Sequence, residues 1–228
     1  MSHSQNVPAV NPLPPAVAAL FLVIMGIEVA FFLGQQGLIG GADAVGWRAN
    51  AIVRFGFSPE ILTWMRETGV WPLEHVIRFV SYSFVHANFT HAVFVGVFVL
   101  AMGKMAAEAM GSLAMIVIFL VSGAGGALAY GVILPDAPWL IGGYPAVYGL
   151  IGAFTFLLWM SLASVGANQT RAFSLIAMLM GIQLVFGLIF GGTNDWVADL
   201  AGFGTGFALS FVLIPGGMQR ILARLRRE

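Results

Sequence analysis

The chain has 228 residues, and its 10 basic and 10 acidic side chains give a formal net charge of zero. Hydrophobic residues make up 59% of the chain and charged residues only 9%, whereas soluble domains carry about 25% charged residues. So few charges cannot solvate a surface, which excludes a soluble globular protein, and the neutral balance argues against a nucleic-acid partner. Cysteine is absent, which excludes disulfides, thiolate metal sites and cysteine nucleophiles. A lipid bilayer is therefore the expected solvent.

Six apolar stretches are long enough, or nearly so, to cross the roughly 30 Å hydrocarbon layer as helices. We expect these spans at 16–33, 88–107, 113–134, 145–162, 172–190 and 196–214. The preceding segment 1–15 is polar and proline-rich, and we expect it to be disordered. It has no basic run before the first apolar stretch, which is therefore interpreted as a retained helix rather than a signal peptide. The sequence predicts an all-α, polytopic membrane protein with its transmembrane domain over 16–215.

The long segment 34–78 is predicted to be an interfacial insert that holds two short helices. In the first, apolar residues recur at helical spacing, namely Val45, Ala49, Ile52 and Val53. The second is indicated by Ser58 as a cap, Pro59 in the first turn and Glu60 after it, and it should stop near Gly69. Neither helix is long enough to span, so both should lie at the membrane surface.

The distribution of basic residues predicts the orientation in the membrane. The tail 216–228 is basic and should be cytoplasmic, because it holds Arg220, Arg224, Arg226 and Arg227. Six spans then place the N-terminus in the cytoplasm as well, with Lys104 and Arg171 on that side and the insert opposite. The compact six-span form without further domains favours a bacterial inner membrane.

The first polar cluster is the segment 84–91, at the mouth of the second span. It contains His86 and His91, and ionisable residues at such a place are costly unless they have partners. Two interpretations stay open: the histidines belong to an active-site or ligand pocket, or they are structural residues that bond to the insert.

The second cluster is the glycine-rich segment 142–153. Pro145 fits the first turn of a helix, which would place Tyr144 at the helix N-terminus, facing inward. Gly149 and Gly152 form a small-residue face that suits close helix packing. Packing accounts for every residue of this cluster except Tyr144.

The third cluster, 195–206, contains an acid inside the last span. Asp199 lies one turn from the start of that helix, where a carboxylate is expected to face the bundle interior and have a partner. Gly202 and Gly206 form a GxxxG face. Glu28 is the other intramembrane acid, and because it lies near a helix end it could snorkel, so no role is assigned to it.

In this order and spacing, the three clusters resemble the rhomboid family of intramembrane serine proteases, over 74–215. The segment 142–153 resembles the family's Gly-Ala-Ser-Gly-Ala-Val-Tyr-Gly-Leu-Ile-Gly-Ala block, and 198–206 resembles its Ala-His-x-x-Gly-x-x-x-Gly block. Arg78 resembles the arginine of the family's Trp-Arg pair, with Ile77 in place of the tryptophan. The resemblance implies six spans, cytoplasmic termini and a long interfacial insert after the first helix.

The departures from the family pattern fall on its catalytic positions. The family's nucleophilic serine falls on Tyr144, its histidine base on Asp199, and its oxyanion-hole asparagine on Val95. Of the four polar active-site positions only His91 keeps the family's residue. Tyr148 also matches the tyrosine that packs beside the family's histidine.

These replacements argue against acyl transfer. A phenol has a reference pKa of about 10 and an aspartate about 3.9, so the two are poorly matched as nucleophile and base. Val95 donates no hydrogen bond, and the loss of one oxyanion donor typically costs about 100- to 1000-fold in rate. We therefore expect no catalytic residue, but a hydrogen bond from Tyr144 to Asp199 that His91 could share. The expected binding or structural polar cluster comprises His86, His91, Tyr144, Tyr148, Asp199 and Arg78.

The leading hypothesis is a catalytically inactive pseudoprotease that binds transmembrane helices of client proteins. The alternatives are an intramembrane serine-type endopeptidase with a non-standard dyad, a small transporter or channel that uses Asp199, Glu28 and the histidines, and a packing subunit of a larger complex. No cofactor or metal is expected, since His86 and His91 are five positions apart rather than four and no third ligand is evident.

Overall fold

Six helices of the computed structural model are long and apolar enough to span a membrane, as the sequence predicts. The structure describes residues 12–190, 192 and 194–217, so the predicted disorder of 1–11 and the arginines of the basic tail lie outside the described residues. The spans are α1 (Pro15–Gln35), Phe89–Met110, α8 (Ser112–Ile133), α9 (Tyr144–Ser164), Gln169–Ile189 and α11 (Trp196–Leu213). The protein is thus an all-helical, multi-pass integral membrane protein.

Two of these spans are composite. The second runs through α6 (Phe89–Phe98), a π-helical turn η3 (Val99–Gly103) and α7 (Lys104–Met110). It ends three residues later than predicted, where Gly111 takes a positive φ of 95° that L side chains rarely adopt. The fifth consists of the 3₁₀ turn η4 (Gln169–Phe173) and α10 (Ser174–Phe190).

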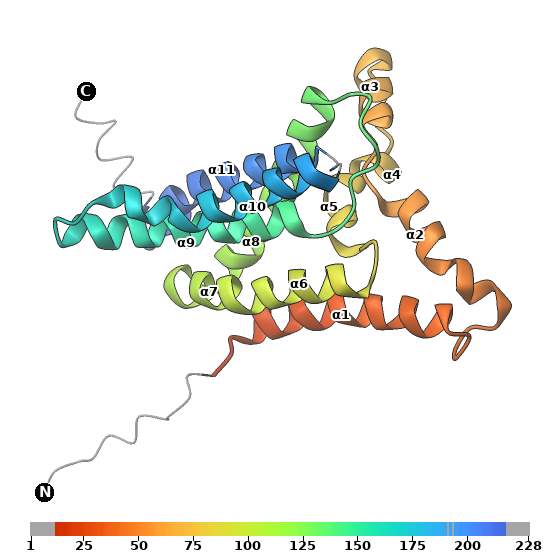
Figure 1. Cartoon of the computed structure of the whole chain (residues 1–228), viewed down its shortest axis with the longest axis horizontal. Helices are drawn as coiled ribbons and strands as arrows, with labels where there is room; N and C mark the ends of the chain where they lie inside the picture. Colours follow the sequence, from red (N-terminus) through yellow and green to blue (C-terminus); the bar gives the residue numbers. More distant parts are fainter. Residues whose placement is uncertain (1–11, 191, 193, 218–228) are drawn as a thin grey trace, which may run out of the picture.

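The helices α8, α9 and α11 form the centre of the bundle, and α1 lies alongside α6 (Figure 1). Small residues let α9 and α11 meet at the backbone: a Cβ on Gly202 would collide with the carbonyl oxygen of Pro145, and one on Gly206 with that of Gly149. The two glycines therefore act as the GxxxG packing face that the sequence predicts. Because Pro145 and Gly202 follow Tyr144 and Asp199 closely, this contact brings the starts of the two helices together.

The insert folds into η1 (Ala42–Gly46), α2 (Trp47–Phe55), α3 (Pro59–Thr68), α4 (Leu73–Val76), α5 (Arg78–Ser81) and η2 (Tyr82–Phe84). The two predicted helices are present as α2 and α3. The Oγ of Ser58 accepts a hydrogen bond from the backbone N–H of Ile61 at 3.3 Å, and Gly69 closes α3 in the left-handed conformation. The elements α4, α5 and η2 were not predicted, because each is four residues long or shorter.

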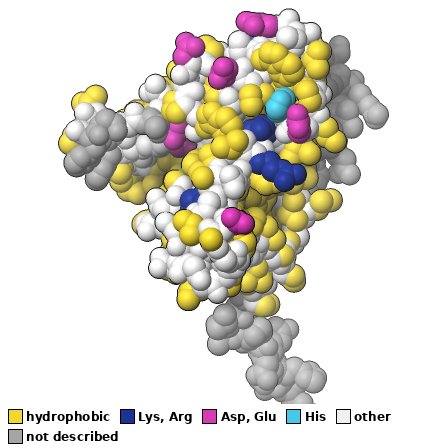
Figure 2. All heavy atoms as spheres, turned by 90° about the vertical axis from the view of Figure 1, so that its right-hand side faces the viewer, with side chains coloured by type: hydrophobic (Ala, Val, Ile, Leu, Met, Phe, Trp, Pro, Cys, Tyr) yellow, Lys and Arg dark blue, Asp and Glu magenta, His cyan; other side chains and the backbone are white. Residues whose placement is uncertain are grey.

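The insert is joined to the bundle by backbone hydrogen bonds and by a shared apolar core. Phe57 and Leu140 exchange backbone hydrogen bonds of 3.0 and 2.9 Å, which join the insert to the loop before α9. A second apolar core joins α3 to α8, with Leu62 and Met65 against Tyr130. Figure 2 views the end of the molecule that carries the insert, where acidic, basic and histidine side chains gather.

The interpretation of Glu28 as a snorkelling acid without a role is wrong. Its side chain is 1% exposed, and its two carboxylate oxygens accept hydrogen bonds of 2.9 and 2.6 Å from Arg48 of α2. The same guanidinium donates to the backbone carbonyl of His86 at 2.7 Å. The fold brings Arg48 over α1 across 20 residues of sequence, which no local pattern indicates, and it ties α1, the insert and the start of α6 together.

We expect Glu28→Gln to lower the stability of the folded protein, because Arg48 would lose its counter-charge in a largely buried site. Removal of one partner of a buried ion pair costs on the order of 3 kcal/mol, measurable as a lower thermal unfolding temperature in mild detergent. Glu60→Gln, at an exposed acid of α3, is the matched control and should leave that temperature nearly unchanged.

The double variant Glu28→Gln with Arg48→Gln should be less destabilised than the sum of the single variants. Strictly additive effects would show that the two side chains are not coupled.

Candidate functional site

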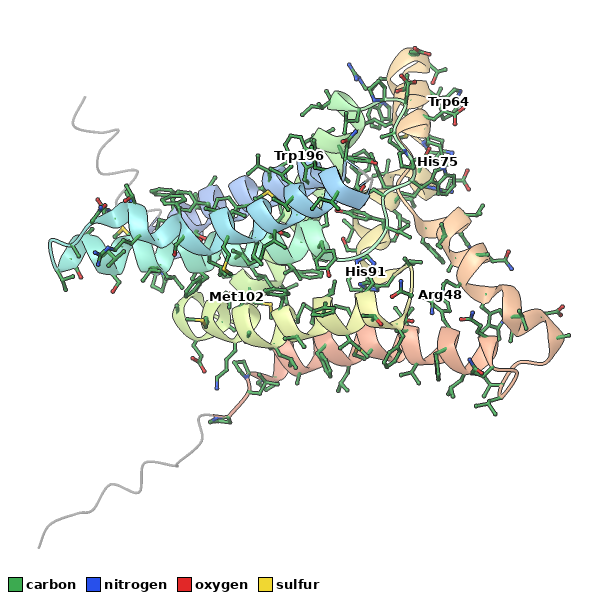
Figure 3. All side chains as sticks on the ribbon, in the orientation of Figure 1. Arg48, Trp64, His75, His91, Met102 and Trp196 are labelled. Atoms are coloured by element: carbon green, nitrogen blue, oxygen red, sulfur yellow. The ribbon has the colours of Figure 1, made fainter. Side chains whose placement is uncertain are left out.

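The candidate site lies where three helices begin. Tyr144 is the first residue of α9, Asp199 lies in the first turn of α11, and His91 lies in the first turn of α6. The side chain of Asn88 caps α6 by accepting a hydrogen bond of 2.9 Å from the backbone N–H of His91. Figure 3 shows His91 between the start of α6 and the loop that leads into α9, with Arg48 between α1 and α2.

The site is recessed below the outer end of α1. Glu28 and the backbone of His86 are both bound by Arg48 and therefore lie at a similar level. The last residue of α1, Gln35, is seven positions beyond Glu28, which corresponds to roughly 10 Å at 1.5 Å per residue. A ligand in this site is thus at the level of an inner turn of α1.

His86 is a buried, neutral acceptor. Its side chain is fully buried, and its Nε2 accepts a hydrogen bond of 3.3 Å from the backbone N–H of Gly143. Burial lowers the pKa of His86 to about 3, and the neighbouring His91 and Arg48 act in the same direction. The neutral imidazole therefore connects the segment before α6 to the loop before α9, while the backbone carbonyl of His86 connects it to the insert.

His91 contacts the two aromatic neighbours of the site. Its ring lies edge-on to that of His86, with centroids 5.1 Å apart, and stacks on that of Tyr144 at 4.8 Å and 22°. Gly142, at φ +92°, leaves room for this ring, because a Cβ there would collide with it. The Nε2 of His91 has no hydrogen-bond partner among the described residues. Stacking, rather than a hydrogen bond, therefore joins His91 to Tyr144.

The hydrogen bond predicted from Tyr144 to Asp199 is not formed, and this expectation is corrected. Asp199 is 2% exposed, and its Oδ2 accepts a hydrogen bond of 2.9 Å from the Nε2 of Gln183 on α10. The hydroxyl of Tyr148 donates to the Oε1 of Gln183 at 3.3 Å. The Oδ1 of Asp199 has no partner among the described residues. The phenol of Tyr144 is turned onto His91, and an amide from a third helix takes its expected place.

Gln183 was not among the predicted site residues. The sequence does hold a signal for it, because it is the one polar side chain in the apolar run 175–190. A polar residue inside a membrane helix commonly faces the bundle and finds a partner.

A cavity of about 420 Å³ lies beside these groups. Tyr144, Tyr148, Gln183 and Asp199 supply its polar lining, and apolar side chains of α6, α9 and α10 supply the rest, including Phe94, Val147 and Ile182. Phe94 is 52% exposed and Ile182 is 51% exposed, so the cavity opens between α6 and α10 toward the surface that faces lipid.

Four predicted positions do not line this cavity, namely His86, His91, Val95 and Arg78. Val95 is fully buried and packs beneath Gly143, so the position of the expected oxyanion donor is filled by an apolar contact. Arg78 donates a hydrogen bond of 3.0 Å to the carbonyl of Gly56 and lies over the ring of Trp139 at 5.4 Å. Burial lowers the pKa of Arg78. Arg78 thus connects the insert to the loop before α9, and the fold does not bring it to the other site residues.

The arrangement offers binding groups more than reactive ones. The phenol of Tyr144 makes no hydrogen bond to a base among the described residues, and the nearest ring is a stacked imidazole. Within the same part of the chain, no group of three or more His, Asp or Glu side chains could hold a metal ion. An unpaired carboxylate oxygen beside an apolar cavity is suited to receive a donor.

The family model for the Rhomboid domain matches residues 73–216. This match runs from the start of α4 to just beyond α11 and includes every residue of the cavity, but neither Glu28 nor Arg48. A search among curated proteins finds no match.

The buried state of His86 predicts a pH-dependent stability. Between its ordinary pKa of about 6.5 and its folded value of about 3, the unfolded chain binds a proton that the native protein does not. The contribution is therefore fully present above about pH 6.5 and is lost as the pH falls toward 3.

His86→Gln keeps a hydrogen-bond acceptor but does not titrate, so we expect a flatter dependence of the unfolding temperature between pH 7 and pH 4. An unchanged slope in His86→Gln would show that His86 does not couple protonation to folding.

Proposed function

Because the chain belongs to the rhomboid family and is a multi-pass membrane protein, we propose that it is a catalytically inactive rhomboid that binds transmembrane segments of client proteins. The observation that carries this proposal is the pairing at the site. The position of the family's serine is Tyr144, stacked on His91, and the position of its histidine is Asp199, bonded to Gln183.

The chemistry of these residues supports inactivity. Acyl transfer needs a nucleophile in hydrogen-bond contact with a base, and donors where the oxyanion develops. Among the described residues, Tyr144 has no hydrogen bond to a base. Val95 has no side-chain donor for an oxyanion. The bulky ring of Tyr144 also lines the cavity that a peptide carbonyl would have to reach.

The cavity that remains supports binding of a helix from the lipid side. Its walls at Phe94 and Ile182 are apolar and half exposed, as expected for a surface that meets either lipid or an apolar helix. On α10, Met178, Leu184, Val185 and Leu188 are exposed as well. The described part of α10 makes few contacts with the rest of the bundle. At the site, Gln183 joins α10 to Tyr148 and Asp199 by hydrogen bonds. A client could therefore enter by displacing this helix.

The proposal includes an orientation. The first residue of α1 and the last residue of α11 lie at the same end of the bundle (Figure 1), as six crossings require. The arginines of the tail argue for the cytoplasmic side of a bacterial inner membrane. Fusions of a periplasm-active reporter to either terminus should be inactive, and an active fusion would reverse the orientation.

We expect the purified protein in liposomes to leave a fluorescent transmembrane reporter uncleaved, at the level of Tyr144→Phe. Cleavage that disappears in Tyr144→Phe would establish a working peptidase instead. Ion flux through the same liposomes that depends on Asp199 would establish a transporter.

Client binding is tested by co-purification in mild detergent followed by mass spectrometry. Ile182→Trp fills the opening of the cavity and should reduce the recovered clients several-fold. Leu113→Trp, at an exposed apolar residue of α8 outside the cavity, is matched in size and should behave like the wild type. Equal recovery with both variants would show that clients do not use this cavity.

A further inference from the structure

Asp199 presents a buried carboxylate oxygen that nothing in the described protein satisfies. The side chain is 2% exposed and lines the cavity, and its Oδ1 has no hydrogen-bond partner among the described residues. A carboxylate oxygen that lacks a donor at such a place is energetically unfavourable. A group that completes this pairing would therefore bind with a strong preference.

The described lining of the cavity holds no cation. Besides Asp199, its polar groups are the hydroxyls of Tyr144 and Tyr148 and the amide of Gln183, and all its other side chains are apolar. The amide donates one hydrogen bond, to Oδ2, and carries no charge. A cation that pairs with this carboxylate would therefore have to come from outside the described lining of the cavity.

Gln183 is placed so that another donor can replace it at the carboxylate of Asp199. It lies on α10, whose neighbouring residues Ile182, Leu184 and Val185 are each about half exposed. Among the described residues, its two ends bond only to Tyr148 and Asp199, at 3.3 and 2.9 Å. A stronger donor that arrives between α6 and α10 can replace it at the carboxylate without breaking any backbone hydrogen bond.

The occupant must be apolar along most of its length, since it arrives between Phe94 and Ile182 on the lipid-facing side, and it must carry a cation at one point. We propose that the cavity receives a lysine or arginine side chain from the transmembrane segment of a client, with Asp199 as its counter-charge and Gln183 in that place when no client is bound. The proposal rests on the proposed function and specifies which clients that function selects. At 1.5 Å per residue, a cation at the level of His86 would lie roughly 10 Å from the C-terminal end of α1.

The test uses synthetic single-span helices of leucine and alanine, labelled with a fluorophore, and the full chain in lipid nanodiscs. Three probes differ at one position about 10 Å from the outer end: leucine, lysine or glutamate. Energy transfer measures binding. We expect the lysine probe to bind at least about tenfold more tightly than the leucine probe, and the glutamate probe more weakly.

Asp199→Asn keeps the size of the side chain and an acceptor oxygen but removes the charge, so the preference for lysine should disappear. Asp136→Asn, at an exposed acid in the loop between α8 and α9, is the control and should keep it. A preference for lysine that persists in Asp199→Asn would overturn the proposal.

Gln183 provides a second test that leaves Asp199 intact. Gln183→Lys supplies the cation from within the chain and should abolish the preference for the lysine probe. Gln183→Met, neutral and of similar length, should retain or increase it. Equal effects of the two variants would overturn the proposal.

The outcomes separate this inference from the proposed function. Equal binding of the leucine and lysine probes to the wild type would overturn the inference and leave client binding in place. Failure of every probe to bind would overturn both.

Discussion

Backbone contact between α9 and α11 is the constraint on which the site depends. Gly202 and Gly206 lie against the carbonyls of Pro145 and Gly149, so neither glycine can take a Cβ without a shift of the backbone. Helices in lipid gain little from burying apolar side chains, and close packing of small residues is a main source of their association. Here that packing has a chemical consequence, because it places the first turns of both helices beside one cavity.

Two sets of polar contacts join the other elements to α9 and α11. Glu28, Arg48 and the carbonyl of His86 bind α1, the insert and the mouth of α6 into one unit, and the Nε2 of His86 continues the connection to Gly143 before α9. This side of the bundle is thus held by charge-assisted hydrogen bonds in a low-dielectric setting, where they are strong. The opposite side is held differently, since the amide of Gln183 supplies the polar attachment of α10 at the site.

This asymmetry is the physical basis of the proposed function. A rigid wall formed by α9 and α11 faces a helix that a competing donor can release, and the cavity between them is apolar except at its polar end. The rhomboid domain surrounds a cavity whose polar end holds Tyr144 and Asp199. Under the proposed function, this geometry receives a helix from the lipid, and the groups at its centre bind charge rather than transfer an acyl group.

The six spans were predictable from local sequence, because a helix in lipid must satisfy its own backbone hydrogen bonds and is recognised by its length and hydropathy. The sequence also determined the ends of α3, through Ser58, Pro59 and Gly69, and the GxxxG contact, since these signals are local. The resemblance to the rhomboid family correctly brought Tyr144 and Asp199 to one cavity. Tertiary structure alone decided their partners. Whether Tyr144 turns to Asp199 or to His91, and whether Gln183 reaches between them, depends on side-chain rotamers and on the rotation of α10. Glu28 pairs with Arg48 because α2 folds back over α1, and no residue spacing in the sequence predicts this contact.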